Sequence, residues 1–123
     1  MTTVEHRVHP RYKVHWHASL IMELENERII HDGHTQDISL GGASFYTGLN
    51  LLVKETVTLL LEIPNGVSKK DWIILEIKCR MIYTVACANH DKFCAGLQFL
   101  SLTDANKRTL DEVLRFRTPI GAI

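Results

Sequence analysis

The chain has 123 residues, of which 46% are hydrophobic and 23% are charged. This length and this apolar content suit one compact domain with its own core, and they argue against intrinsic disorder. Fourteen lysine and arginine residues balance fourteen acidic residues, so the formal net charge is zero. A neutral chain lacks the broad basic field that non-specific binding of DNA or RNA requires, so we expect neither as a partner, and any anion site must be local.

No uninterrupted apolar stretch approaches the roughly 18 residues of a membrane span. The first residues show no basic segment followed by an apolar run, so nothing indicates a secretory signal. We therefore expect a cytoplasmic protein without membrane insertion. Three cysteines, Cys79, Cys87 and Cys94, have a spacing typical of neither a disulfide framework nor a C-x-x-C motif. We expect reduced and mostly buried thiols.

The alternation of apolar and polar residues predicts six antiparallel strands. Their expected ranges are 13–25, 28–40, 43–45, 56–63, 73–85 and 93–99. In the first range the even positions, from Val14 to Leu24, are all apolar, which predicts one buried face. The Asp32-Gly33 pair falls midway along the second range and predicts a bulge or turn there. In the fifth range, Tyr83 falls on the apolar face.

Beyond the last strand the apolar spacing changes to that of a helix, with Leu110, Val113 and Leu114 on one face. Ser101 or Thr103 can cap its first turn. Strands of this number and length, followed by a single helix, predict an all-β fold. We expect a small barrel or tight sandwich, which removes exposed edges, and of the two we predict a six-stranded antiparallel β-barrel with one C-terminal α-helix over an opening.

The expected organisation is one domain that spans the whole chain. Within it we predict a flexible N-terminal arm over residues 1–12, the barrel over residues 13–100 and the helix over residues 101–118. The sequence shows no internal repeat and no low-complexity tract that would mark a linker between domains.

Two short motifs carry the chemistry. Arg7 and Arg11 lie in the polar arm before the first strand. Asp37 and Ser39 lie two residues apart in an extended segment, so their side chains project to one face, and Gly42 follows them. An arginine binds a phosphate or the O6/N7 edge of guanine with two parallel hydrogen bonds, and it also stacks on a base. A carboxylate accepts from the N1–H and amino groups of guanine, so the set suits an anionic guanine nucleotide.

The order and spacing of these motifs, R-x-x-x-R at residues 7–11 and D-x-S-x-x-G at residues 37–42, resemble the PilZ domain of bacteria. The run A-G-L-Q-F-L at residues 95–100, before a capped helix, also resembles the end of that family. The resemblance implies a PilZ-like barrel that acts as a receptor for cyclic di-GMP, a bacterial second messenger, and that is not an enzyme and needs no cofactor.

The resemblance also implies the role of each motif residue. Arg7 and Arg11 are expected to grip the phosphates of cyclic di-GMP and to stack on or bond to its guanines. Asp37, Ser39 and Gly42 are expected to hold a guanine from the barrel surface.

The implied cellular role is the control of motility, biofilm formation or type IV pilus function. Because the sequence predicts no output domain, we expect the nucleotide-bound protein to act through an unidentified partner protein. The arm from Met1 to Pro10 has few aliphatic anchors, so we expect it to be mobile without ligand and to fold over the ligand on binding. Many relatives carry a basic residue where this chain has His6, which leaves the number of bound ligand molecules open.

Three alternatives remain, one for the whole chain, one for Asp37 and Ser39, and one for Tyr83. The chain can be a PilZ-like interaction module that binds no nucleotide. Asp37 and Ser39 can bond their own backbone in a turn, with or without a ligand role. Tyr83 can belong to the core or contact a base.

Three further alternatives involve other chemistry. The patterns H-x-x-H at residues 6–9 and H-x-H at residues 15–17 have the spacing of metal ligands, although solvated histidines explain them more simply and we predict no metal site. A catalytic set of Ser39, His34 and Asp37 rests on residue type alone, since no nucleophile elbow or phosphate-binding loop is present. A small barrel can also bind a flavin, which would make the protein an oxidoreductase.

Overall fold

The computed structural model describes residues 9–48, 56–64, 72–87, 92–115, 117 and 119–120. Within these ranges the strands are β1 (Tyr12–Lys13), β2 (His17–Leu24), β3 (Glu27–Ile38), β4 (Gly42–Thr47), β5 (Thr56–Pro64), β6 (Trp72–Ala86) and β7 (Phe93–Ser101). The helix α1 (Asp104–Leu114) follows β7.

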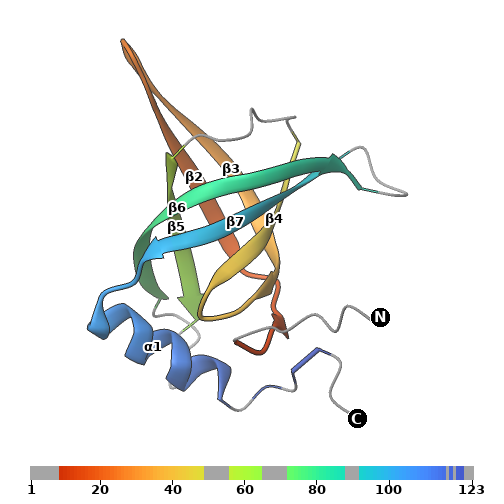
Figure 1. Ribbon diagram of the computed structural model, residues 1–123, viewed down its shortest axis with the longest axis vertical. Coiled ribbons are helices and arrows are strands. Elements are labelled where there is room, and N and C mark those ends of the chain that lie inside the picture. Colours follow the sequence, from red (N-terminus) through yellow and green to blue (C-terminus); the bar gives the residue numbers. More distant parts are fainter. Residues whose placement is uncertain are drawn as a thin grey trace, which may run out of the picture.

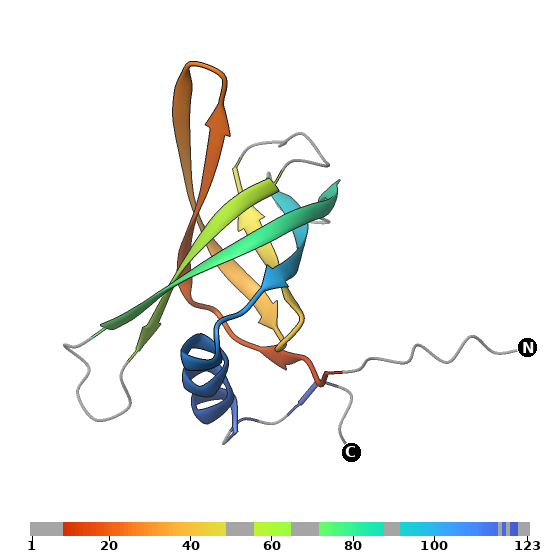
Figure 2. The same cartoon turned by 60° about the vertical axis from the view of Figure 1, so that its left-hand side comes forward.

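The six longer strands form one antiparallel sheet in the order β3-β2-β5-β6-β7-β4, and β4 pairs back onto β3. The sheet therefore closes into a barrel, which leaves none of these six strands as a free edge. The short strand β1 adds to β3 beside the start of β2. Figures 1 and 2 show the strands wrapping around a common interior, with α1 packed beside one end. The predicted six-stranded antiparallel barrel with one C-terminal helix is confirmed.

The core contains the apolar face of each strand. Five even positions of the first predicted strand are at most 7% exposed, as predicted: Val14, Trp16, Ala18, Leu20 and Met22. The helix contributes Leu110 and Leu114, which are both buried, and Thr103 caps its first turn by accepting a hydrogen bond from the amide of Asn106 at 3.1 Å. In the described part of the chain, no helix is long and apolar enough to cross a membrane.

The predicted first strand, residues 13–25, divides into β1 and β2. The buried hydroxyl of Thr35 on β3 bridges the interruption. It accepts a hydrogen bond from the Trp16 amide at 2.9 Å and donates one to the Val14 carbonyl at 2.5 Å. The prediction of one continuous strand is wrong here, because apolar alternation reports which side chains are buried and does not report which backbone groups pair.

The predicted distortion of the second strand lies further along the chain. Asp32 and Gly33 pair in regular register with β2, and the register of β3 against β4 shifts between Thr35 and Asp37 instead. Gly33 is required for another reason, since a Cβ atom there would meet the Tyr46 carbonyl oxygen. The actual shift lies directly before Asp37, one of the predicted site residues.

The cysteines differ from the prediction. Cys87 and Cys94 form a disulfide bond, with their Cα atoms 5.9 Å apart. The hairpin of β6 and β7 explains the pairing, because its register places Val85 opposite Cys94 and brings Cys87 to the same end. Spacing alone could not indicate this bond. Cys79 is a buried free thiol as predicted, and burial raises its pKa to about 12.

Three histidines gather on the outer face of β2 and β3. The rings of His15 and His34 stack with centroids 4.6 Å apart, and the ring of His17 meets His34 edge-on at 5.7 Å. The Nδ1 atom of His17 also lies 2.8 Å from Glu62 Oε2. Among the described residues, no group of three or more histidine, cysteine or acidic side chains is placed to hold a metal ion. Burial, followed by the charges of His15, His17 and Lys92, lowers the pKa of His34.

Loss of the disulfide should destabilise the fold. Replacing Cys87 and Cys94 together by serine should lower the free energy of unfolding by about 2 kcal/mol, because the unfolded chain is no longer cross-linked. Urea unfolding without reductant measures the change. Dithiothreitol should move the wild-type midpoint by a similar amount and leave the double variant unmoved. A wild-type midpoint that ignores the reductant would contradict the bond.

The histidine group should make stability depend on pH. Because the pKa of His34 is lowered in the folded state, the unfolded chain takes up this proton first as the pH falls below the ordinary value of 6.5. The folding stability that neutral His34 contributes is therefore present at neutral pH and is lost on acidification. Urea unfolding at about pH 7.5 and at about pH 5.5 measures this change. Between these two pH values, the free energy of unfolding should fall less in His34→Gln than in the wild type. His31→Gln, on the same strand outside the stacked group, is the control and should behave like the wild type.

Candidate ligand-binding site

One row of residues crosses four strands on the outer surface of the barrel. Asp37 on β3 lies opposite Ser44 on β4, Ser44 lies opposite Gly96 on β7, and Gly96 lies opposite Tyr83 on β6. Residues that are directly opposite on neighbouring strands share a face of the sheet. The strands β3 and β4 stand at opposite ends of the sheet order. Their pairing closes the barrel and therefore brings their side chains into one site with those of β6 and β7.

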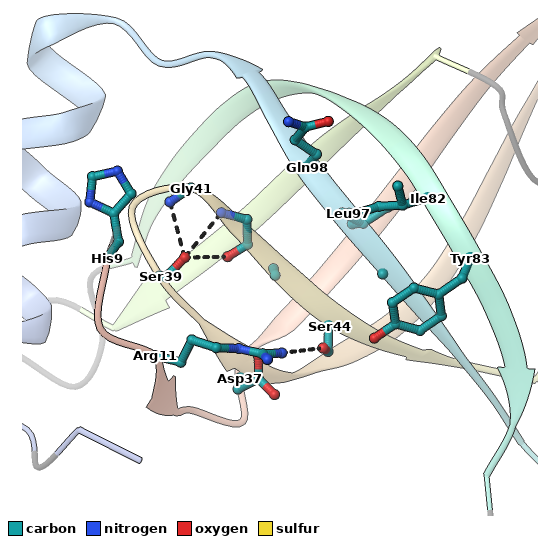
Figure 3. Close-up of a pocket in the computed structure, with 13 residues that line it drawn as sticks. His9, Arg11, Asp37, Ser39, Gly41, Ser44, Ile82, Tyr83, Leu97 and Gln98 are labelled. Atoms are coloured by element: carbon teal, nitrogen blue, oxygen red, sulfur yellow. Dashed lines mark hydrogen bonds and ion pairs between the residues drawn. The ribbon is translucent and has the colours of Figure 1, made fainter. Parts of the chain in front are cut away.

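This row belongs to a cleft of about 510 Å³ that is open to solvent. Four of the five predicted site residues line it: Arg11, Asp37, Ser39 and Gly42. Figure 3 shows Arg11, Asp37 and Ser39 on one side of the cleft, with Tyr83 facing them from β6. The fifth predicted residue, Arg7, lies outside the described residues.

An ion pair fixes Arg11 at the edge of the cleft. Its Nε and Nη2 atoms donate to Asp37 Oδ1 at 3.2 and 2.8 Å, and Nη2 also donates to Ser44 Oγ at 3.3 Å. The Arg11 side chain is 32% exposed and that of Asp37 is 14% exposed. Among the described residues, none bonds to Arg11 Nη1 or to Asp37 Oδ2.

Ser39 shapes the turn between β3 and β4. Its Oγ accepts hydrogen bonds from the amides of Gly41 and Gly42 at 3.0 and 3.2 Å, and its own amide donates to the Gly42 carbonyl at 2.9 Å. Figure 3 shows this network at the rim of the cleft. The interpretation in which the serine bonds its own backbone therefore holds for Ser39, whereas the carboxylate of Asp37 contacts Arg11 instead.

Two glycines leave the middle of the cleft free of side chains. A Cβ atom on Gly42 would meet the Leu97 carbonyl of the neighbouring strand β7, and a Cβ atom on Gly96 would meet the Tyr83 ring. Gly42 is therefore required for the close approach of β4 and β7, in addition to any approach of a ligand. Gly96 was not predicted as a site residue, although a glycine inside an alternating strand pattern is a signal of close contact.

The wall formed by β6 depends on another register shift, between Met81 and Tyr83. At this shift, Ile82 and Tyr83 are 53% and 41% exposed, and both line the cleft. The prediction that Tyr83 continues the buried face of this strand is wrong, because one extra residue in the strand changes which side chains point inward. The Tyr83 ring instead lies against Gly96 and offers a flat apolar surface.

His9 is another lining residue that the motif analysis did not select. A Cβ atom on Gly41 would lie 3.2 Å from Cδ2 of His9, so the imidazole covers the turn between β3 and β4. The sequence feature that could have indicated His9 is its position between the two arginines of the first motif. The other histidine of the H-x-x-H pattern, His6, lies outside the described residues.

The chemistry of the cleft suits a flat, polar anion. Arg11 supplies cationic donors, Asp37 and Gln98 supply acceptors and an amide, and Tyr83 supplies an aromatic face. The catalytic set considered from sequence is not assembled, because His34 lines a different hollow, beside His17.

The model of the PilZ domain family matches residues 5–116 of the chain. A search of curated proteins finds no match. Among solved structures, the chain is similar to the inhibitor of motility MotI/DgrA of Bacillus subtilis, with a TM-score of 0.72 and 16% identity over 94% of this chain and 53% of that one. It is also similar to the PilZ domain with c-di-GMP of YcgR from Escherichia coli, with a TM-score of 0.61 and 15% identity over 90% of this chain and 93% of that one.

A third similar structure is the MrkH–c-di-GMP complex of K. pneumonia, with a TM-score of 0.59 and 16% identity over 91% of this chain and 51% of that one. The chain thus spans about half the length of MotI/DgrA and of MrkH. At these identities the solved structures show a shared fold, and the family model adds a match over most of the sequence. The chain belongs to the PilZ domain family.

Proposed function

We propose that this protein is a receptor that binds cyclic di-GMP in the cleft between Arg11 and Tyr83 and signals through a partner protein. The observation that carries the proposal is that the described residues of both sequence motifs line one cleft. Two of the similar structures, those of YcgR and MrkH, are complexes with c-di-GMP, and this supports the choice of ligand.

Each wall of the cleft offers a contact that a guanine dinucleotide can use. The Nη1 donors of Arg11 bind a phosphate, for which a guanidinium is well suited. The Oδ2 atom of Asp37, which bonds no other described residue, accepts from the N1–H and amino groups of a guanine. The exposed Tyr83 ring stacks on a base, an interaction worth about 1–3 kcal/mol per base. The cleft volume of about 510 Å³ falls in the range of small-molecule sites.

The remaining motif residues have more indirect roles in this proposal. Ser39 holds the turn that presents Asp37 and the backbone of Gly42 to the guanine, since its hydroxyl is already bonded to that turn. Arg7 supplies a second guanidinium for the phosphates, and the N-terminal arm folds over the bound nucleotide. The ordered arm and the nucleotide together form the surface that a partner recognises.

The proposed setting is the cytoplasm of a bacterium, where the receptor controls motility, biofilm formation or type IV pilus function without catalysis of its own. Apolar side chains beside the cleft support contact with a partner, since Ile82 and Val85 on β6 are each more than half exposed.

Calorimetry tests the proposal directly. Micromolar protein should bind cyclic di-GMP and should bind GMP or GTP more weakly. Arg11→Ala should raise the Kd about 30-fold, or about 2 kcal/mol, the lower end of the range for truncating one member of a charged pair. Arg28→Ala is the matched control, because Arg28 is exposed and pairs with Glu23 outside the cleft. No heat change for the wild type would contradict the proposal and leave an interaction module that binds no nucleotide.

Salt should separate the roles of Arg11 and Asp37. The loss of affinity caused by Arg11→Gln should shrink as the salt concentration rises, because ions screen its attraction for phosphate. The loss caused by Asp37→Asn should depend less on salt, because it reflects mainly hydrogen bonds to an uncharged base. Titrations at low and high salt measure both. The opposite pattern would reverse the two assignments.

A further inference from the structure

The C-terminal segment, defined here as Arg117, Pro119 and Ile120, contacts the residue that enters the cleft. The amide of Ile120 donates to the carbonyl of Arg11 at 2.7 Å, and Pro119 forms an isolated antiparallel bridge with Tyr12. Figures 1 and 2 show the described blue stretch after α1 near the red start of β1. The last described residues therefore lie against the base of the N-terminal arm.

The other end of the segment is attached to the core. The guanidinium of Arg117 lies 5.6 Å from the centre of the Trp16 ring, and Trp16 is only 4% exposed. The amide of Arg117 donates to the carbonyl of Leu114 at 3.0 Å, which continues the end of α1. The segment thus joins the barrel core and the helix to the backbone of Arg11.

Arg11 needs such a support. It precedes β1, a strand of two residues that pairs with β3 through Tyr12 and Lys13. A strand this short at the outer side of a sheet has few hydrogen bonds and opens easily. The C-terminal segment contacts β1 on the side away from β3, so the backbone at Arg11 is held from both sides. This segment follows the residues that the family model matches, which end at residue 116.

We infer that the C-terminal segment positions Arg11 for ligand binding, and that the nucleotide in turn stabilises the segment. The inference rests on the proposed function for its ligand. With its carbonyl bonded to Ile120, Arg11 keeps its guanidinium at Asp37 and at the cleft. Coupling between two sites is reciprocal, so a ligand that orders Arg11 also strengthens the contact of the segment. The C-terminal segment is thereby a second surface whose stability depends on whether cyclic di-GMP is bound.

The test compares Ile120→Pro with Ile120→Ala. Proline removes the amide that donates to Arg11, whereas alanine keeps it and shortens the side chain. Ile120→Pro should raise the Kd for cyclic di-GMP about three- to tenfold, the effect of one lost hydrogen bond, with a melting temperature close to that of the wild type. Ile120→Ala should bind nearly as the wild type does. Equal affinities for the two variants would overturn the inference.

A double-mutant cycle shows whether the segment acts through Arg11. In an Arg11→Ala background, Ile120→Pro should no longer weaken binding, because the side chain that it positions is gone. An unchanged loss in that background would assign the effect to another route and overturn the inference.

A measurement without ligand separates this inference from the proposed function. Hydrogen exchange at the amide of Tyr12 should be faster in Ile120→Pro than in Ile120→Ala, while the barrel amides of Leu59 to Leu61 stay unchanged. In the wild type, cyclic di-GMP should slow exchange at Ile120. If the wild type binds no nucleotide, the proposed function fails, yet the exchange at β1 still decides whether the segment positions Arg11. Equal exchange in the two variants would contradict that positioning.

Discussion

The ion pair between Arg11 and Asp37 joins the N-terminal end of the described chain to the seam where the barrel closes. A partly exposed pair of this kind contributes only about 0.5 kcal/mol to stability, so its importance lies in geometry. Asp37 is fixed by the register shift in β3 and by its place opposite Ser44 on β4. Arg11 is held by Asp37 at its side chain and by Ile120 at its backbone. The site therefore depends on barrel closure as much as on the motif residues themselves.

The shape of the cleft follows from the same closure. A closed barrel of six strands requires close approach between neighbouring strands, and Gly42 meets that requirement at the Leu97 carbonyl. Because Gly96 has no side chain, the Tyr83 ring packs directly against β7. The absence of side chains at these two positions leaves a hollow on an outer barrel surface, where alternating strands usually present polar side chains to water. A flat ligand can then rest between a guanidinium on one side and an aromatic ring on the other.

Much of the fold could be predicted from the sequence, because period-two alternation reports burial directly, and Val14 to Met22 show this. Two errors share one cause, since the gap between β1 and β2 and the shift beside Tyr83 are both departures from regular pairing inside an unbroken alternation. The motif analysis assigned Arg11 and Asp37 to one ligand, and both line one cleft, but motif spacing could not indicate that they bond to each other. The contact of Ile120 with Arg11 joins opposite ends of the sequence, and no local pattern reports such a contact.

Nuclear magnetic resonance of the isotope-labelled protein, titrated with cyclic di-GMP, tests the central claim most directly. The cleft and the ion pair predict that the largest changes fall on the Arg11 side-chain Nε–H and on the amides of the turn at residues 41–44 and of β7 at residues 96–98. Amides on the opposite side of the barrel, in β2 and β5, should change little. Changes centred on β2 and β5, or no change at the Arg11 Nε–H at saturating ligand, would contradict the assignment of this cleft as the nucleotide site.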